Sequence, residues 1–289
     1  MQALRYARAT SIDEAVRMLR EGGETARVLA GGTDVIVQAR ERRRVIELFV
    51  DIKQIPDVMT LEYDRQRGLR VGAAVPLYRV YGHADVQRVY PALRAAAHVI
   101  GGKAIQGRAT LGGNLCNASP AADSIPAAMA LDGVAEIAGP GGRREVRVDE
   151  FCTGPGRNVL QPGEFVVALR FPQPAPHSGQ AWERFIPRNE MDIAVVNAAC
   201  ALTLDGEVVT SARIALGAVA PRTILVPAAA EALVGRRLTD DTVAAAGAAA
   251  KEAATPIDDM RGTVKQRKHL SDVLVQHVVR AAGERARSN

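Results

Sequence analysis

Apolar residues near the start of the chain recur every three or four positions, which is the spacing of one face of an α-helix. The apolar stripe covers 12–19. Ser11 precedes it, and Glu14 follows three residues later, which forms a capping box. Gly22-Gly23 end the expected helix. The next expected elements are a strand at 27–30, a short helix at 35–40 and a strand at 45–51. Together they predict a small β-α-β type unit over about residues 1–57.

The middle of the chain alternates between strand and helix patterns. Its expected elements are a strand at 69–75, a helix with Pro91 in its first turn, a helix from the N-cap Ser119 through Pro120 to Leu131, a hairpin of 134–138 with 143–148, and a strand at 165–171. Three prolines and a glycine over 172–179 then predict a linker.

The last part of the chain has strand patterns followed by helix patterns, which is typical of an α+β domain. Strands are expected at 199–204 and 208–216, joined near Asp205-Gly206, with helices at 227–235, 240–254 and 264–285. We therefore expect an α+β protein with domains at 1–57, 58–172 and 173–289.

Two glycine-pair segments carry most of the candidate chemistry. The first is Val28-Leu29-Ala30-Gly31-Gly32-Thr33-Asp34, and the second is Thr110-Leu111-Gly112-Gly113-Asn114, followed by Ser119 and Asp123. A glycine pair allows positive φ and removes side chains that would block a ligand. Backbone N–H groups in such turns form a cradle for an anion. Two facing cradles would suit a pyrophosphate, although a tight turn would also explain each glycine pair.

The polar residues beside the glycines extend this hypothesis. The hydroxyls of Thr33, Thr110 and Ser119 and the amide of Asn114 could bond a diphosphate or a ribityl chain. A carboxylate repels phosphate, so Asp34 is expected to cap the short helix that follows it. Asp123 could accept hydrogen bonds from ribityl or ribose hydroxyls, or it could complement the dipole of its helix.

Composition and the remaining motifs exclude several classes. The sequence has neither a P-loop nor a Rossmann glycine fingerprint. Its basic residues are spread along the chain apart from Arg40-Glu41-Arg42-Arg43-Arg44, so the net charge of +5 is weak evidence for nucleic acid, and none is expected as a partner. The N-terminus resembles no secretory signal, and no apolar run approaches a membrane span, so the cytoplasm is the expected compartment.

The three cysteines are Cys116, Cys152 and Cys200, and their spacing fits neither a zinc site, an iron–sulfur site nor a disulfide framework. We expect Cys152 and Cys200 to be buried structural thiols. Cys116 follows the second glycine pair, so it is either a third such thiol or a neighbour of a ligand. No Ser/His/Asp or Cys/His arrangement is present, and no catalytic or metal-binding residue is predicted.

Five strings spread through the chain resemble the flavin-binding medium subunit of the molybdenum hydroxylases, the family of carbon monoxide dehydrogenase and xanthine dehydrogenase. They are VLAGGTDVIVQ at 28–38, ATLGGNLCNASPAAD at 109–123, FCTGPGRNVLQPGEFVVALRFP at 151–172, WERFIPRNEMDIAVVNAA at 182–199 and PIDDMRGTVKQRKHL at 256–270. The resemblance implies a two-subdomain FAD-binding fold of the vanillyl-alcohol oxidase (PCMH) type. It also implies a C-terminal α+β domain with a three-stranded antiparallel sheet. The cysteine-bearing insertion of the 4-hydroxybenzoyl-CoA reductase branch is absent.

The same resemblance implies that FAD sits between the two N-terminal subdomains. The backbone of 30–33 and 111–114 would surround the diphosphate, Asp123 would contact the cofactor, and Val166 would lie against its ring system. Ile100 falls where some relatives carry an aromatic residue. Arg184 falls where many carry a lysine near the flavin, although a surface salt bridge with Glu183 or Glu190 is the alternative. The predicted cofactor-binding residues are Leu29, Ala30, Gly31, Gly32, Thr33, Asp34, Ile100, Thr110, Leu111, Gly112, Gly113, Asn114, Ser119, Asp123, Val166 and Arg184.

The implied partners are a small subunit with two [2Fe–2S] clusters and a large subunit with the molybdenum cofactor, in a dimer of heterotrimers. The flavin of such a complex receives electrons from the clusters and passes them to an external acceptor. Two other functions stay open from the sequence. One is a self-contained FAD-dependent oxidoreductase of the same fold, and the other is a non-enzymatic nucleotide-binding assembly protein. The substrate and the terminal acceptor are not encoded in any motif of this chain.

Overall fold

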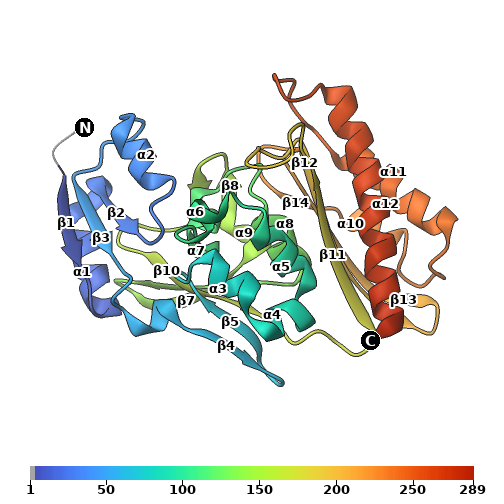
Figure 1. Cartoon of the computed structure of the whole chain (residues 1–289), viewed down its shortest axis with the longest axis horizontal. Coiled ribbons are helices and arrows are strands. Elements are labelled where there is room, and N and C mark those ends of the chain that lie inside the picture. The colour runs from blue at the N-terminus through green and yellow to red at the C-terminus, as the bar shows by residue number, and fades with distance from the viewer. Residues whose placement is uncertain (1–3) are drawn as a thin grey trace.

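The computed structural model describes residues 4–289, in which three sheets follow one another along the long axis of the molecule (Figure 1). The first sheet is parallel, in the order β1-β3-β2. Its elements are β1 (Arg5–Arg8), α1 (Ile12–Gly22), η1 (Gly23–Thr25), β2 (Ala26–Leu29), α2 (Val35–Arg40) and β3 (Leu48–Asp51). The predicted N-cap is confirmed, because the Ser11 hydroxyl accepts a hydrogen bond from the Glu14 N–H. The reciprocal bond of the predicted capping box is not formed, because Glu14 Oε2 accepts the Thr10 N–H instead.

The second sheet has five antiparallel strands in the order β4-β5-β10-β6-β7. The strands are β4 (Leu61–Asp64), β5 (Gly68–Gly72), β6 (Val134–Gly139), β7 (Gly142–Arg147) and β10 (Phe165–Phe171). The predicted 134–148 hairpin and the 165–171 strand are confirmed. Strand β4, after the short helix η2 (Pro56–Met59), was not predicted, because its four residues are only half-buried or exposed and lack an apolar run.

Short helices cover one side of this sheet and enclose an apolar core with it (Figure 1). The second sheet and these helices form the middle region, residues 61–171. The helices are α3 (Leu77–Gly82), α4 (Ala84–Val89), α5 (Pro91–His98), α6 (Lys103–Gln106), α7 (Leu111–Asn117), α8 (Ser124–Ala130) and α9 (Val148–Phe151). The two short strands β8 (Cys152–Gly154) and β9 (Arg157–Asn158) pair beside them. The expected start of a helix at Ser119 is wrong. Helix α8 starts at Ser124, and the Ser119 hydroxyl accepts only a long bond, 3.4 Å, from the Ala121 N–H.

The third sheet is antiparallel and has four strands, not the three expected from the sequence. They are β11 (Ser178–Phe185), β12 (Val196–Asp205), β13 (Val208–Gly217) and the two-residue edge strand β14 (Ile224–Leu225). The linker predicted at 172–179 gives way to β11 at Ser178. Strand β11 escaped prediction because its inward positions include Gln180 and Arg184, so its pattern does not alternate cleanly between apolar and polar.

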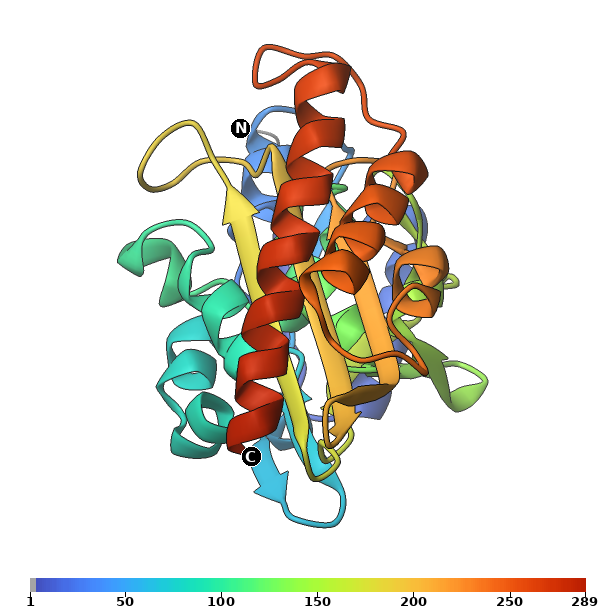
Figure 2. The same ribbon diagram turned by 90° about the vertical axis from the view of Figure 1, so that its right-hand side faces the viewer.

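The third sheet is covered on both faces. Helices α11 (Asp240–Ala253) and α12 (Val264–Ser288) lie on its outer side together with α10 (Pro227–Glu231), and the long α12 runs across the strands (Figure 2). Helix α12 approaches β11 closely, since a Cβ atom at Gly179 would lie 1.9 Å from the Ala282 carbonyl oxygen. The inner face packs against α5 and α8 of the middle region. Strands β11, β12 and β13 therefore border the segment that leads into α8.

Within residues 4–289, no helix has the length and apolar character needed to cross a membrane.

Candidate functional site

The first glycine segment leaves β2 and turns into α2. Gly32 has φ +82°, a conformation that favours glycine, and its carbonyl accepts the Ile36 N–H at 3.2 Å. Among the described residues, the backbone N–H groups of 31–34 have no protein acceptor. The Asp34 side chain stands at the N-cap position of α2 but bonds none of its N–H groups, so the expected capping role of Asp34 is wrong. The segment therefore presents a row of free donors, which is what an anion requires.

The second glycine segment is not the positive-φ turn that its glycine pair predicts, because it starts a helix. Thr110 is the N-cap of α7, and its hydroxyl accepts the Gly113 N–H at 2.9 Å. The Thr110 carbonyl accepts the Asn114 N–H at 3.0 Å. Neither glycine of this pair has positive φ. Gly112 is needed for packing instead, because a Cβ atom there would lie 2.6 Å from Ala73 Cβ and 2.7 Å from the Ala73 carbonyl oxygen.

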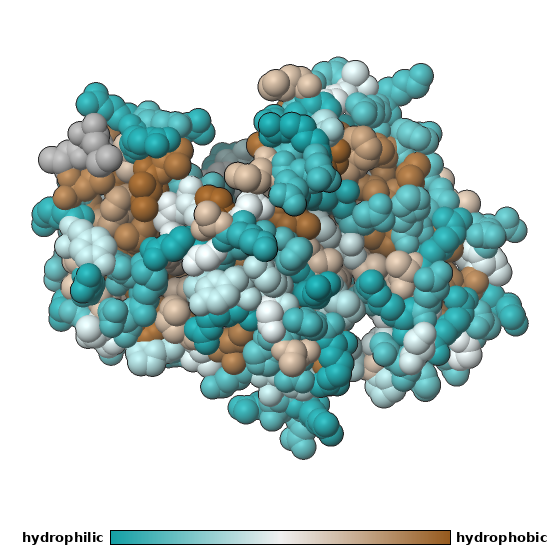
Figure 3. Space-filling view, in the orientation of Figure 1, coloured by the Kyte–Doolittle hydropathy of each residue, from teal (hydrophilic) through white to brown (hydrophobic). Residues whose placement is uncertain are grey.

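The first segment contacts the backbone of the two residues just before the second segment. A Cβ atom at Gly31 would lie 2.2 Å from the carbonyl oxygen of Arg108 and 3.0 Å from Ala109 Cα. Next to this contact, Gln38 of α2 donates to Asn117 of α7 at 3.0 Å. The space-filling view is hollowed between the lobe that carries α2 and the part that carries α6 and α7 (Figure 3). The tertiary structure thus brings the two glycine segments to one crevice.

Lys53, which the sequence analysis missed, contacts the backbone of the first segment. Lys53 Nζ donates to the Ala30 carbonyl at 3.1 Å and pairs with the buried Asp51 carboxylate at 2.8 Å. Its positive charge therefore lies next to the residue that precedes Gly31. Nothing in its local sequence marks this role, because the contact depends on the parallel pairing of β2 with β3.

Asp123 and Arg184 form a buried ion pair between the middle region and the third sheet. Arg184 Nη1 lies 2.8 Å from Asp123 Oδ2, and the two side chains are 7% and 12% exposed. The expected alternative partners of Arg184, Glu183 and Glu190, are therefore wrong. Asp123 also does not cap its helix, which leaves Asp123 Oδ1 buried and without a hydrogen-bond donor among the described residues. Burial raises the pKa of Asp123 to about 6, and Arg184 and the side-chain amide of Asn197 oppose that rise.

The remaining predicted residues are mostly buried or half-buried. Leu29, Leu111 and Val166 are buried, and Leu111 and Val166 belong to the same core, against which the half-buried Ile100 also packs. Their side chains consequently act mainly in packing. The amide of Asn114 is bonded already, since its Oδ1 accepts the Ser124 hydroxyl at 2.6 Å. Thr33 and Ser119 are half-buried beside the two segments.

The cysteines behave as packing residues. Burial raises the pKa of the Cys116 and Cys200 thiols to about 12 and that of Cys152 to about 11. Cys152 and Cys200 are buried as expected, and Cys116 is half-buried. A thiol with such a pKa is protonated near neutral pH, so none of the three is an activated nucleophile.

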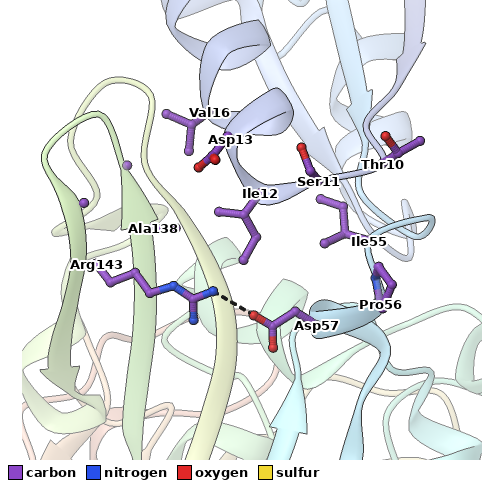
Figure 4. Close-up of a pocket in the computed structure, with 12 residues that line it drawn as sticks. Thr10, Ser11, Ile12, Asp13, Val16, Ile55, Pro56, Asp57, Ala138 and Arg143 are labelled. Carbon is purple, nitrogen blue, oxygen red and sulfur yellow. Dashed lines mark hydrogen bonds and ion pairs between the residues drawn. The ribbon is translucent and has the colours of Figure 1, made fainter.

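Two surface pockets lie away from the crevice. One of about 420 Å³ opens between the start of α1 and the 138–143 hairpin, where Asp57 and Arg143 pair at 2.9 Å (Figure 4). The other, of about 580 Å³, lies over the charged face of the five-stranded sheet, around Arg70, Glu136 and Arg170. Neither pocket is lined by a predicted cofactor-binding residue. The candidate site therefore rests on the contacts of the glycine segments and of Asp123.

Two known protein families match segments that together cover most of the chain. The family described as the FAD binding domain in molybdopterin dehydrogenase matches residues 2–174, and the CO dehydrogenase flavoprotein C-terminal domain matches residues 184–282. This chain belongs to the FAD-binding medium subunits of the carbon monoxide dehydrogenase and xanthine dehydrogenase family. It is thus an oxidoreductase subunit, the flavoprotein component, and it carries an FAD-binding domain.

Relatives of this medium-subunit family match along nearly the whole chain. The putative xanthine dehydrogenase FAD-binding subunit of Escherichia coli is 32% identical over 96% of this chain and 95% of its own length. The carbon monoxide dehydrogenase medium chain of Afipia carboxidovorans is 32% identical over 98% of both chains. A carbon monoxide dehydrogenase structure from Hydrogenophaga pseudoflava superposes with a TM-score of 0.94, at 30% identity and 98% coverage of both chains. These matches confirm the mixed helix and strand fold of a medium subunit.

Proposed function

We propose that this chain is the FAD-carrying electron-transfer subunit of a molybdenum-containing hydroxylase or dehydrogenase. A small partner with [2Fe–2S] clusters delivers electrons to it, a large partner holds the molybdenum cofactor, and an external acceptor receives the electrons. The family membership supports this proposal, and so does the similarity to a solved Cu,Mo-CO dehydrogenase structure.

The observation that carries the proposal is the backbone contact of Gly31 with Arg108 and Ala109. It brings the unbonded N–H groups of 31–34 to the edge of the second glycine segment. An anionic diphosphate fits such a row of donors, because each N–H lacks a protein acceptor. The unpaired oxygen of Asp123 fits a hydroxyl donor in the same way, since a buried acceptor without a partner is costly to the fold.

The residues of the candidate site divide the work by their chemistry. The N–H groups of 31–34 bind the diphosphate, and Asp123 Oδ1 accepts a hydrogen bond from a sugar or ribityl hydroxyl. Arg184, which Asp123 holds in place, supplies a buried positive charge that favours electron density on a nearby ring. FAD supplies the redox chemistry when bound, and the protein orients it and tunes it. The resemblance further implies that Val166 lies against the ring system.

Finer features of the proposal follow from the same resemblance. The proposal includes a division into domains at 1–57, 58–172 and 173–289 and an FAD-binding part of the vanillyl-alcohol oxidase (PCMH) type. It also includes a dimer of heterotrimers and a cytoplasmic location. The roles of all sixteen predicted site residues belong to it as well, except that the Asp34 side chain caps no N–H group and the glycine pair at 112–113 starts a helix.

The test is the cofactor content of the complex purified with this chain. We expect the absorption bands of an oxidised flavin, FAD after extraction, and iron and molybdenum in the partner subunits. The flavin bands should bleach when the substrate of the large subunit is added under anaerobic conditions. A complex that contains molybdenum and iron but no flavin would contradict the proposal.

A further inference from the structure

The segment that leads into α8, residues 119–123, is held mainly by the third sheet. The N–H of Ala218, the residue just after β13, donates to the Pro120 carbonyl at 2.7 Å. Asn197 Nδ2 on β12 donates to the Ala122 carbonyl at 3.3 Å. Arg184 on β11 pairs with Asp123. Strands β11 and β12 and the residue after β13 therefore hold residues 119–123 in place (Figure 1).

Asn197 is the most confined member of this group. Its side chain is 0% exposed, and it stands opposite Arg184 in the β11–β12 register and opposite Gly217 in the β12–β13 register. A Cβ atom at Gly217 would lie 2.0 Å from Asn197 Oδ1, so the glycine leaves the space that the amide occupies. A buried amide that fits one such space has one orientation.

The amide acts on the residue that leads directly into Asp123. Its bond to the Ala122 carbonyl fixes the backbone on one side of Asp123, and Arg184 fixes Oδ2 on the other side. With both restraints in place, the second carboxylate oxygen, Oδ1, is held in one direction and has no other hydrogen bond among the described residues, and the Asn197 amide also lies close enough to Asp123 to lower its pKa. An acceptor that is fixed before its ligand arrives loses little conformational freedom on binding.

We propose that Asn197 is a positioning residue for the cofactor site, acting through Ala122 and Asp123. This inference rests on the proposed function, because it needs a hydroxyl-bearing flavin cofactor as the ligand of Asp123. It goes beyond that function by making the C-terminal part of the chain responsible for the geometry of the cofactor's acceptor. The sequence carried one signal for this role, a single amide within the apolar run of 194–202.

Gln180 provides a matched control. It is also a buried amide of the third sheet, and its Nε2 donates to a backbone carbonyl of the FAD-binding part, that of Val89, at 2.9 Å. Its Oε1, like Asn197 Oδ1, has no hydrogen-bond partner among the described residues. Gln180 lies four residues before Arg184 in β11. It therefore has the same side-chain chemistry as Asn197 but does not lie beside Asp123.

The experiment compares FAD affinity of the full chain, by titration of flavin fluorescence, in N197L, Q180L, D123A and the double variant N197L/D123A. We expect N197L to weaken FAD binding about tenfold, which corresponds to the loss of one hydrogen bond from a cofactor hydroxyl to the charged Asp123 carboxylate. We expect Q180L to leave FAD binding unchanged. In the D123A background, N197L should have no further effect, because the amide then has no carboxylate to position. The visible circular dichroism of bound flavin should change in N197L and not in Q180L.

A second variant covers the case in which N197L does not fold. G217A leaves the amide in the chain but displaces it, and it should reproduce the loss of affinity. Equal effects of N197L and Q180L, or an undiminished effect of N197L in the D123A background, would overturn the positioning role. A wild-type chain without affinity for FAD would instead refute the proposed function, so the two failures are distinguishable.

Discussion

Replacement of Gly31 by alanine tests whether the backbone contact between the two glycine segments builds the cofactor crevice. The added Cβ atom would lie 2.2 Å from the Arg108 carbonyl oxygen, 2.8 Å from the Arg108 carbonyl carbon and 3.0 Å from Ala109 Cα. All three are backbone atoms, which no rotamer change can move away. The segments must therefore separate by about 1 Å, and overpacking of this kind costs about 1–3 kcal/mol.

Two quantities should change in the G31A variant. A loss of about 2 kcal/mol lowers the melting temperature of a domain of this size by about 4–8 °C. FAD affinity should fall at least tenfold, because the donors of 31–34 move away from the second segment. Differential scanning fluorimetry and flavin titration of the full chain measure both quantities.

Gly113 gives the matched control within the second glycine pair. It is exposed in α7, and a Cβ atom there would meet only the Thr110 hydroxyl, at 3.0 Å. Alanine is favoured over glycine in a helix by about 1 kcal/mol, so G113A should keep the stability of the wild type or exceed it. The reasoning would be refuted by a G31A variant that melts and binds FAD like the wild type.

The other predictions concern buried charges and thiols. The R184M variant removes the cation from Asp123, whose pKa then rises above about 6, and the stability given by the protonated carboxyl is lost as pH rises through that value. Urea unfolding should show a deficit of about 3–5 kcal/mol at pH 8 and a smaller one at pH 5, whereas equal deficits would contradict this. Arg267 is 3% exposed and binds the Val195 carbonyl and Asp259, so R267M should lose about 3 kcal/mol of unfolding free energy in the same assay, and an unchanged midpoint would rule its anchoring role out. Burial raises the pKa of all three thiols, so iodoacetamide at pH 8 should label them in urea but not in the native chain, as mass spectrometry would reveal; rapid native labelling would disprove it.

The elements that the sequence predicted well are those fixed by residues close together in the chain. The cap of α1 depends on Ser11 and Glu14 within one turn, and the 134–148 hairpin depends on adjacent strands joined by glycines. The start of α8 was misplaced because a Ser-Pro pair favours an N-cap locally, whereas residues 119–123 are drawn to the third sheet by the bonds of Ala218, Asn197 and Arg184.

By itself the sequence determined which segments carry the glycines, the apolar strands and the family strings, since these are properties of residue type and spacing. Tertiary structure alone decided that Gly31 abuts Arg108, that the second glycine pair starts a helix packed on Ala73, and that Arg184 neutralises Asp123. Those contacts join residues far apart in the chain, and they arise only when separate cores pack together. Local preferences do not contain that packing energy, so no pattern along the chain could have specified the partners.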